Sequence, residues 1–179
     1  MKKFYLLLLG ILLFPLGNST AQQRREIGNM ILEDVPEIPL EIKERIQQYQ
    51  NTRSAFLADW MPGNEGILIS TRFGNTNQLH IVGSPGAFRN QVTFFGEPVT
   101  NGTFCPMPEY SGFLFTKDEG GNEFSQIFWY DMKSRNAEML SDGTSVNFGI
   151  LWSNRGDRFA FTSTRRNKVD FDVYVSSMD

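Results

Sequence analysis

The chain has 179 residues, of which 40% are hydrophobic, and its 16 glycines and 8 prolines are typical of many short strands joined by tight turns. The formal net charge of −3 argues against a surface that follows a phosphate backbone, so we do not expect nucleic acid as a partner. Cys105 is the single cysteine, so the chain has no internal disulfide and must be stabilised by packing.

Residues 1–21 have the pattern of a secretory signal peptide. Lys2 and Lys3 form a positive start, residues 4–16 are an apolar run too short for a comfortable membrane span, and residues 19–21 are small, as a signal peptidase requires. We therefore expect an exported protein, periplasmic or extracellular, with no membrane span after the signal is cleaved.

Residues 22–54 are expected to form a lead-in segment that is polar and irregular up to Glu37 and helical over about residues 39–51. Pro39 suits the first turn of this helix. Its apolar residues recur at helical spacing: Ile38, Ile42, Ile46 and Tyr49. Such an amphipathic helix could bind a partner, but packing on its own domain is more common.

A repeat of 46 residues governs the chain from Ala55 onward. The repeated segments are Ile67-Leu68-Ile69-Ser70, Phe113-Leu114-Phe115-Thr116 and Phe159-Ala160-Phe161-Thr162, with Leu79, Ile127 and Val173 in corresponding later positions. A period of this length, filled with strand-forming residues, is typical of four-stranded propeller blades. The strands that it predicts cover residues 55–59, 67–71, 78–83, 91–94, 113–117, 126–131, 137–140, 148–152, 158–164 and 172–176.

We therefore predict an all-β fold, a partial β-propeller preceded by a short amphipathic helix. Blade 1 should cover residues 55–99, blade 2 residues 100–146, and an incomplete blade 3 residues 147–179. Two blades and most of a third cannot close a ring, which usually takes about four to eight blades. We expect the chain to be the N-terminal part of a longer product, the alternative being a complete protein that closes by assembly of two or three copies.

Several segments of the sequence resemble a known protein family. The segment from Ile38 to Arg53, followed by Ala55-Phe56-Leu57-Ala58-Asp59-Trp60, resembles the start of the propeller in exported prolyl oligopeptidase-family serine peptidases. Residues 70–80 and 91–95 are similar to its first blade, and residues 152–163 resemble the wider TolB-like pattern of WD-like propeller repeats. The resemblance implies a propeller that admits short or unfolded peptides to a C-terminal α/β-hydrolase domain with a Ser, Asp and His triad.

No catalytic residue carries over from that family. The G-x-S-x-G motif of the hydrolase domain is absent from the 179 residues, so this chain should be inactive alone. The paired glutamates with which the dipeptidyl peptidase branch grips a substrate are also absent, which leaves that branch unsupported. We expect the chain to gate and position peptides for a hydrolase domain outside it. A TolB-like binding propeller that scaffolds contacts in the cell envelope is the alternative.

His80 is the only histidine, so any general base or zinc ligand of the imidazole type would have to use it. Phe128 and Tyr174 stand at its equivalent positions in the repeat, which predicts a structural ring within a sheet. Cys105, beside Pro106, is assigned to the position of Trp60 and Trp152 in the repeat, and we expect it to be a small buried hydrophobe.

Two charged loops occupy matching positions in the second and third units. The acidic loop comprises Asp118, Glu119, Gly120, Gly121 and Glu123, and the basic loop comprises Arg165, Arg166 and Lys168. The acidic loop lacks the ligand spacing of an EF-hand, and a solvated tip is expected. The basic loop could contact a peptide carboxylate, although such loops are more often simply exposed.

Asn101-Gly102-Thr103 fits the glycosylation tripeptide. We expect no catalytic, cofactor-binding or metal site in this chain, and we expect the hydrolase domain and peptide substrates as partners.

Overall fold

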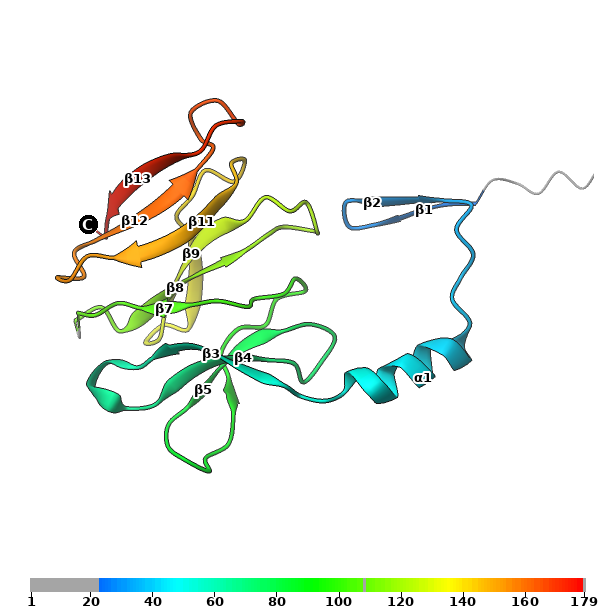
Figure 1. Ribbon diagram of the computed structural model, residues 1–179, viewed down its shortest axis with the longest axis horizontal. Coiled ribbons are helices and arrows are strands. Elements are labelled where there is room, and N and C mark those ends of the chain that lie inside the picture. The colour runs from blue at the N-terminus through cyan, green and yellow to red at the C-terminus, as the bar shows by residue number, and fades with distance from the viewer. Residues whose placement is uncertain (1–22, 108, 179) are drawn as a thin grey trace, which may run out of the picture.

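The computed structural model describes residues 23–107 and 109–178, which form antiparallel β-sheets and, among these residues, one α-helix. Three sheets are stacked one on the next, while a small hairpin and the helix stand beside the stack (Figure 1). The predicted signal peptide lies outside the described residues.

Each sheet is built from strands that follow one another along the chain. Sheet 1 contains β3 (Ala55–Trp60), β4 (Ile67–Thr71), β5 (Gln78–Val82) and β6 (Asn90–Gln91), with the 3₁₀ turn η1 (Pro62–Asn64) after β3. Sheet 2 contains β7 (Thr103–Phe104), β8 (Gly112–Lys117), β9 (Gln126–Asp131) and β10 (Asn136–Met139). Sheet 3 contains β11 (Asn147–Trp152), β12 (Arg158–Ser163) and β13 (Asp172–Ser177). The predicted all-β architecture with four-stranded antiparallel sheets is confirmed.

The pairing of the second and third strands keeps one register in all three sheets. The corresponding pairs are Ile69 with His80, Phe115 with Phe128, and Phe161 with Tyr174. Because side chains alternate across a strand, this shared register gives every sheet two equivalent faces. The first face of sheets 2 and 3 packs on the sheet before, and the second face of sheets 1 and 2 packs on the sheet after.

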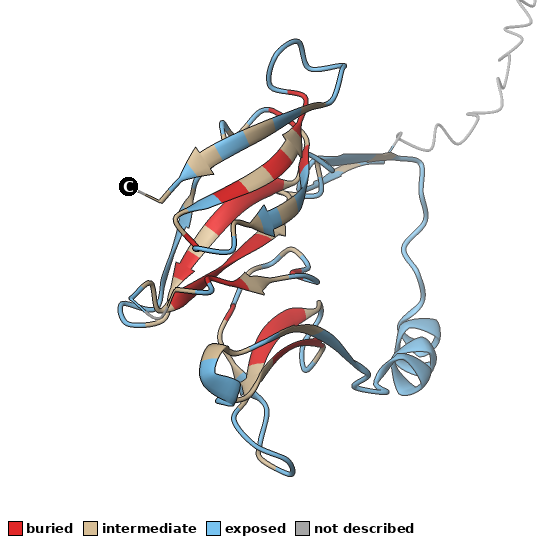
Figure 2. Cartoon of the chain, turned by 60° about the vertical axis from the view of Figure 1, so that its left-hand side comes forward, coloured by how far each residue is buried: buried red, intermediate tan, exposed pale blue. Residues whose placement is uncertain are grey.

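The core lies between the sheets rather than within one of them. Figure 2 shows that the buried residues lie mainly on the strands of the stack, while the helix is exposed. Between sheets 1 and 2, Leu68 and Leu79 from a second face meet Phe113, Phe115, Phe128 and Tyr130 from a first face. Between sheets 2 and 3, Leu114 and Ile127 meet Phe159 and Phe161 in the same manner. Each such side chain contributes about 1.5–3 kcal/mol when fully buried, so the sheets stabilise one another by contact.

Two buried glutamines brace sheets 1 and 2 at equivalent positions. Gln78 donates from Nε2 to the carbonyl oxygens of Phe95 (3.0 Å) and Glu97 (2.9 Å). Gln126 donates to the carbonyl oxygen of Ser145 (2.7 Å) and accepts from the Ser141 hydroxyl (2.7 Å). Because buried polar groups must be paired, these bonds hold the loop after the fourth strand against the third strand.

The expectation of an irregular segment before the helix is wrong for residues 24–33. They form a hairpin of β1 (Arg24–Ile27) and β2 (Met30–Glu33), turned at Gly28 and Asn29. Gly28 has a φ of 58°, the left-handed conformation that a two-residue hairpin turn requires.

Helix α1 (Leu40–Gln50) occurs where the sequence predicts a helix, but the expectation that it packs on its own domain is wrong. None of its residues is buried, and Figure 2 shows it exposed along its whole length. The extended residues 51–54 carry the chain from the helix to β3, so α1 stands beyond the edge of sheet 1 (Figure 1).

Candidate functional site

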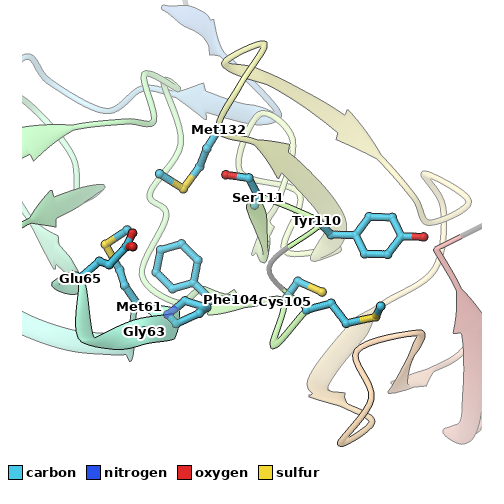
Figure 3. A pocket seen from close by; sticks show the side chains of 11 residues that line it. Met61, Gly63, Glu65, Phe104, Cys105, Tyr110, Ser111 and Met132 are labelled. Atoms are coloured by element: carbon cyan, nitrogen blue, oxygen red, sulfur yellow. The ribbon is translucent and has the colours of Figure 1, made fainter.

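A cavity of about 310 Å³ opens where sheets 1 and 2 meet, at the end of the stack formed by the connections after β3 and β7. Figure 3 shows the side chains of Met61, Phe104 and Met132 around this space, with the Ser111 hydroxyl at its edge. The residues that line it are Met61, Pro62, Gly63, Glu65, Phe104, Cys105, Met107, Tyr110, Ser111, Gly112 and Met132.

Tight backbone turns position the two sides of the cavity. The amide of Met61 donates to the carbonyl oxygen of Gly66 (3.0 Å), and the amide of Cys105 donates to that of Gly112 (3.1 Å). A Cβ at Gly112 would collide with the carbonyl oxygen of Tyr130, so only glycine fits where β8 begins. The lining is therefore fixed by the same strands that build the core.

The side chains that line this cavity offer an apolar surface and no pair of catalytic groups. Cys105 is buried, its thiol lies 3.6 Å from the carbonyl oxygen of Gly156, and burial raises its pKa, so the sulfur stays protonated at neutral pH. No histidine, lysine or second carboxylate joins Glu65 among the described residues of the lining, so no acid–base pair stands beside a nucleophile there. Methionine and phenylalanine side chains can receive an apolar group by burial.

The position that the sequence assigned to Cys105 is corrected by one residue. Phe104 pairs with Phe113 as Trp60 pairs with Ile67 and Trp152 with Phe159, so Phe104 is the equivalent of the two tryptophans. The connection from Phe104 to Phe113 is two residues longer than the other two connections, so a constant spacing of 46 points to Pro106, next to Cys105, instead of to Phe104.

His80 lies in the middle of β5 and is fully buried. Its ring packs 5.1 Å from that of Phe73, and Nδ1 lies 3.0 Å from the carbonyl oxygen of Gln78. Burial lowers the pKa of His80, with a further decrease from Arg89, so the imidazole is neutral near pH 7. Since the carbonyl oxygen can only accept, the neutral ring carries its hydrogen on Nδ1. The side chain is a ring within a sheet and faces no second catalytic group.

The acidic loop is the place where the hairpin tip contacts sheet 2. Asn29 donates from its amide to the carbonyl oxygen of Gly120 (3.0 Å) and from Nδ2 to that of Glu119 (2.9 Å). The Gly120 amide in turn donates to Glu97 (2.9 Å), which lowers the pKa of that carboxyl group, and Lys117 lies 3.5 Å from the same carboxylate. The loop is thus held at its tip by a segment that precedes the helix.

The cations of the basic loop are engaged within the chain. The Arg165 guanidinium lies over the ring of Tyr174 (5.1 Å), and Arg166 pairs with Asp172 and, more loosely, with Asp170 (3.4 Å). Both guanidinium groups are thus held by contacts within the chain. The possible contact with a peptide carboxylate stays a prediction.

Lys168 crosses from the basic loop to the end of sheet 2. Its ammonium group donates to Asp142 (3.2 Å), Thr144 (2.6 Å) and Ser145 (2.9 Å). Partial burial opposes ionisation of Asp142, but the hydrogen bonds from Ser145, Thr144 and Lys168 outweigh it, and the pKa falls well below its ordinary value. This network ties sheet 3 to sheet 2, and its carboxylate is charged at any physiological pH.

Asn101, the asparagine of the glycosylation tripeptide, accepts hydrogen bonds through Oδ1 from the amide (3.1 Å) and the hydroxyl (3.0 Å) of Thr116.

Within residues 23–107 and 109–178, no three His, Cys, Asp or Glu side chains gather as they would around a metal ion. In the same part of the chain, no helix combines the length and the apolar character needed to cross a bilayer.

The comparisons with known proteins identify the fold. No family model and no curated protein matches the chain. A putative TolB from Agrobacterium tumefaciens superposes with a TM-score of 0.56 at 13% identity, covering 72% of this chain and 47% of that one. Dipeptidyl peptidase 4 from Porphyromonas gingivalis superposes with a TM-score of 0.57 at 15% identity, covering 72% of this chain and 18% of that one.

The chain therefore spans about half the length of the first of these proteins and less than a fifth of the second. At such low identities the likeness shows the fold alone. Together with the stacked sheets, it confirms the prediction of a partial β-propeller.

Proposed function

We propose that this chain is the N-terminal propeller part of an exported serine peptidase of the prolyl oligopeptidase family. In this role it gates and positions peptides for an α/β-hydrolase domain outside these 179 residues. The observation that carries the proposal is the superposition of the stacked sheets on the dipeptidyl peptidase 4 of P. gingivalis over 72% of this chain. The resemblance of residues 38–60 to the start of such propellers supports it.

The chemistry of the described residues is consistent with a gating role. Catalysis by acyl transfer needs an activated nucleophile, and the thiol of Cys105 and the ring of His80 are both buried and held by backbone contacts. The cavity beside Met61 offers an apolar surface instead. Export, to the periplasm or the exterior, is part of the proposal and is supported by the signal-like residues 1–21.

A TolB-like binding propeller, acting as an interaction scaffold in the cell envelope, is the second candidate. The superposition on the putative TolB from A. tumefaciens favours it, because the TM-score of 0.56 is almost equal to that of the peptidase. Both candidates use the same blades, and they differ in whether a hydrolase domain accompanies them.

A fluorophosphonate probe separates the two candidates, because it labels an activated serine. The complete product of the gene should be labelled in its native host, and the label should map outside the 179 residues. The 179-residue chain alone serves as the control and should stay unlabelled. A complete product that folds, binds protein partners and never reacts with the probe would refute the peptidase and support the scaffold.

A further inference from the structure

The cavity between sheets 1 and 2 is lined by three of the seven methionines of the chain. Met61 follows β3, Met107 follows β7 and Met132 follows β9, so each comes from a different connection. Met61 and Met132 also pack against the buried cluster that joins the two sheets, and sheet 3 contributes none of the lining residues. Because a methionine side chain is unbranched and polarisable, this lining adapts to apolar groups of different shapes.

The size of the cavity limits what can enter it. Its volume of about 310 Å³ is at the lower end of the range of about 300–1,000 Å³ for ligand sites. One large side chain of a ligand fits such a space, and the remainder of the ligand stays outside. The Ser111 hydroxyl lies at the edge (Figure 3), where it can hydrogen-bond a backbone amide or carbonyl group of that remainder.

The ionisable groups around the cavity are negative. Glu65 belongs to the lining, and Figure 3 shows it next to Met61. Within residues 23–107 and 109–178, its carboxylate forms no hydrogen bond or ion pair. Glu109 lies close enough for its charge to act on Cys105, whose pKa is raised first by burial and further by this carboxylate. Since the described lining holds no lysine or arginine, a cation is the complementary charge for a ligand.

We propose that the cavity is a subsite for peptides in which an apolar residue stands next to a lysine or arginine. The apolar side chain fills the space between Met61, Phe104 and Met132. The neighbouring cation pairs with the carboxylate of Glu65 at the rim. A fatty acid would also fill an apolar space, but its carboxylate has the same sign as Glu65 and Glu109. The inference rests on the part of the proposed function by which the chain positions peptides, and it adds the class of peptide.

The first test measures the binding of short peptides to the complete product of the gene, treated with the fluorophosphonate so that an activated serine cannot hydrolyse them. Fluorescence anisotropy compares three dye-labelled peptides that carry leucine–lysine, alanine–lysine or leucine–glutamate between glycines. The leucine–lysine peptide should bind most tightly. Alanine in place of leucine should weaken binding about tenfold, because less apolar surface is buried. Glutamate in place of lysine should weaken it about threefold to tenfold, because repulsion replaces an exposed ion pair.

The second test changes the charge and the volume of the cavity. Glu65→Lys should reverse the preference between the lysine and glutamate peptides, with each affinity changing about threefold to tenfold. Glu44→Lys is the matched control, since Glu44 is exposed on α1 and lies outside the lining, and it should leave both affinities unchanged. Ser111→Leu narrows the cavity and should weaken the leucine–lysine peptide about tenfold. Far-ultraviolet circular dichroism verifies that each variant folds.

The fluorophosphonate label and the peptide affinities report on different claims. A labelled product that binds the three peptides equally, or binds none of them, would keep the peptidase and overturn the subsite. An unlabelled product that prefers the leucine–lysine peptide would refute the peptidase and support the subsite. If Glu65→Lys kept the preference of the wild type, the cation would be pairing elsewhere, and the assignment of the peptide to this cavity would be wrong.

Discussion

Truncating Phe113 to alanine tests whether the contact between sheets 1 and 2 stabilises the chain. Phe113 is 0% exposed and lies in the cluster that joins Leu68 and Leu79 of sheet 1 to sheet 2, and its ring also stacks on that of Tyr130 in its own sheet at 4.8 Å. Removing a fully buried phenylalanine side chain costs about 3–5 kcal/mol, since transfer energy is lost and a cavity remains. Against a domain stability of about 5–15 kcal/mol, Phe113→Ala should remove a fifth or more of the free energy of unfolding.

Urea unfolding followed by tryptophan fluorescence measures this change, because Trp129 and Trp152 lie at the interface between sheets 2 and 3. Phe88→Ala is the matched control: Phe88 is 82% exposed, so the same chemical change should shift the free energy by about 0.5 kcal/mol or less. Both variants are compared with the wild type at one protein concentration. If Phe113→Ala unfolded at the same urea concentration as Phe88→Ala, the sheets would not depend on one another as argued.

Three further outcomes are expected. Asp142→Asn should be less stable than the wild type at pH 7. Because the folded pKa of Asp142 is depressed, its contribution is present above the ordinary value of 3.8 and is lost as pH falls below it, so the two proteins should converge in acid unfolding curves. Cys105 should react with a thiol reagent at pH 8 only after denaturation, and rapid reaction of the native chain would contradict its burial. Asn29→Ala should speed amide hydrogen exchange in the hairpin of residues 24–33 and leave β8 protected, and an unchanged hairpin would show that its tip contacts contribute nothing.

The stacked sheets were predictable because their signal is periodic and local. Short apolar runs such as Ile67-Leu68-Ile69 and Phe113-Leu114-Phe115 return after 46 residues, so the positions of the central strands follow from the sequence. Gln78 and Gln126 hold equivalent positions, each directly before an aligned residue of the third strand, but the repeat does not predict that their side chains brace a loop.

Features that depend on distant contacts could not be read from this pattern. The docking of Asn29 on Gly120 joins two turns, and neither turn carries a periodic signal. The shift from Cys105 to Phe104 arises in a loop, where added length costs little. Helix α1 has the apolar spacing of a packed helix, but spacing cannot tell whether a neighbouring surface lies within reach.

The 46-residue repeat does not predict the cavity beside Met61 either. Met61 and Cys105 both begin the connection after a first strand, which is a recognisable position, but Met132 lies in the turn directly after β9. Only the stacking of sheet 1 on sheet 2 brings these side chains around one space.

The contact between Asn29 and Glu119 spans 90 residues of chain, whereas neighbouring strands of each sheet are joined by short turns. A nascent polypeptide emerging from the ribosome can pair β3 with β4 early, but the hairpin has nothing to dock on until β8 and β9 exist. A contact between residues so far apart in sequence forms slowly relative to local pairing. The hairpin, although it is synthesised before any of the sheets, should thus be among the last segments to reach its final contacts, and it would stay accessible to chaperones and proteases throughout that interval.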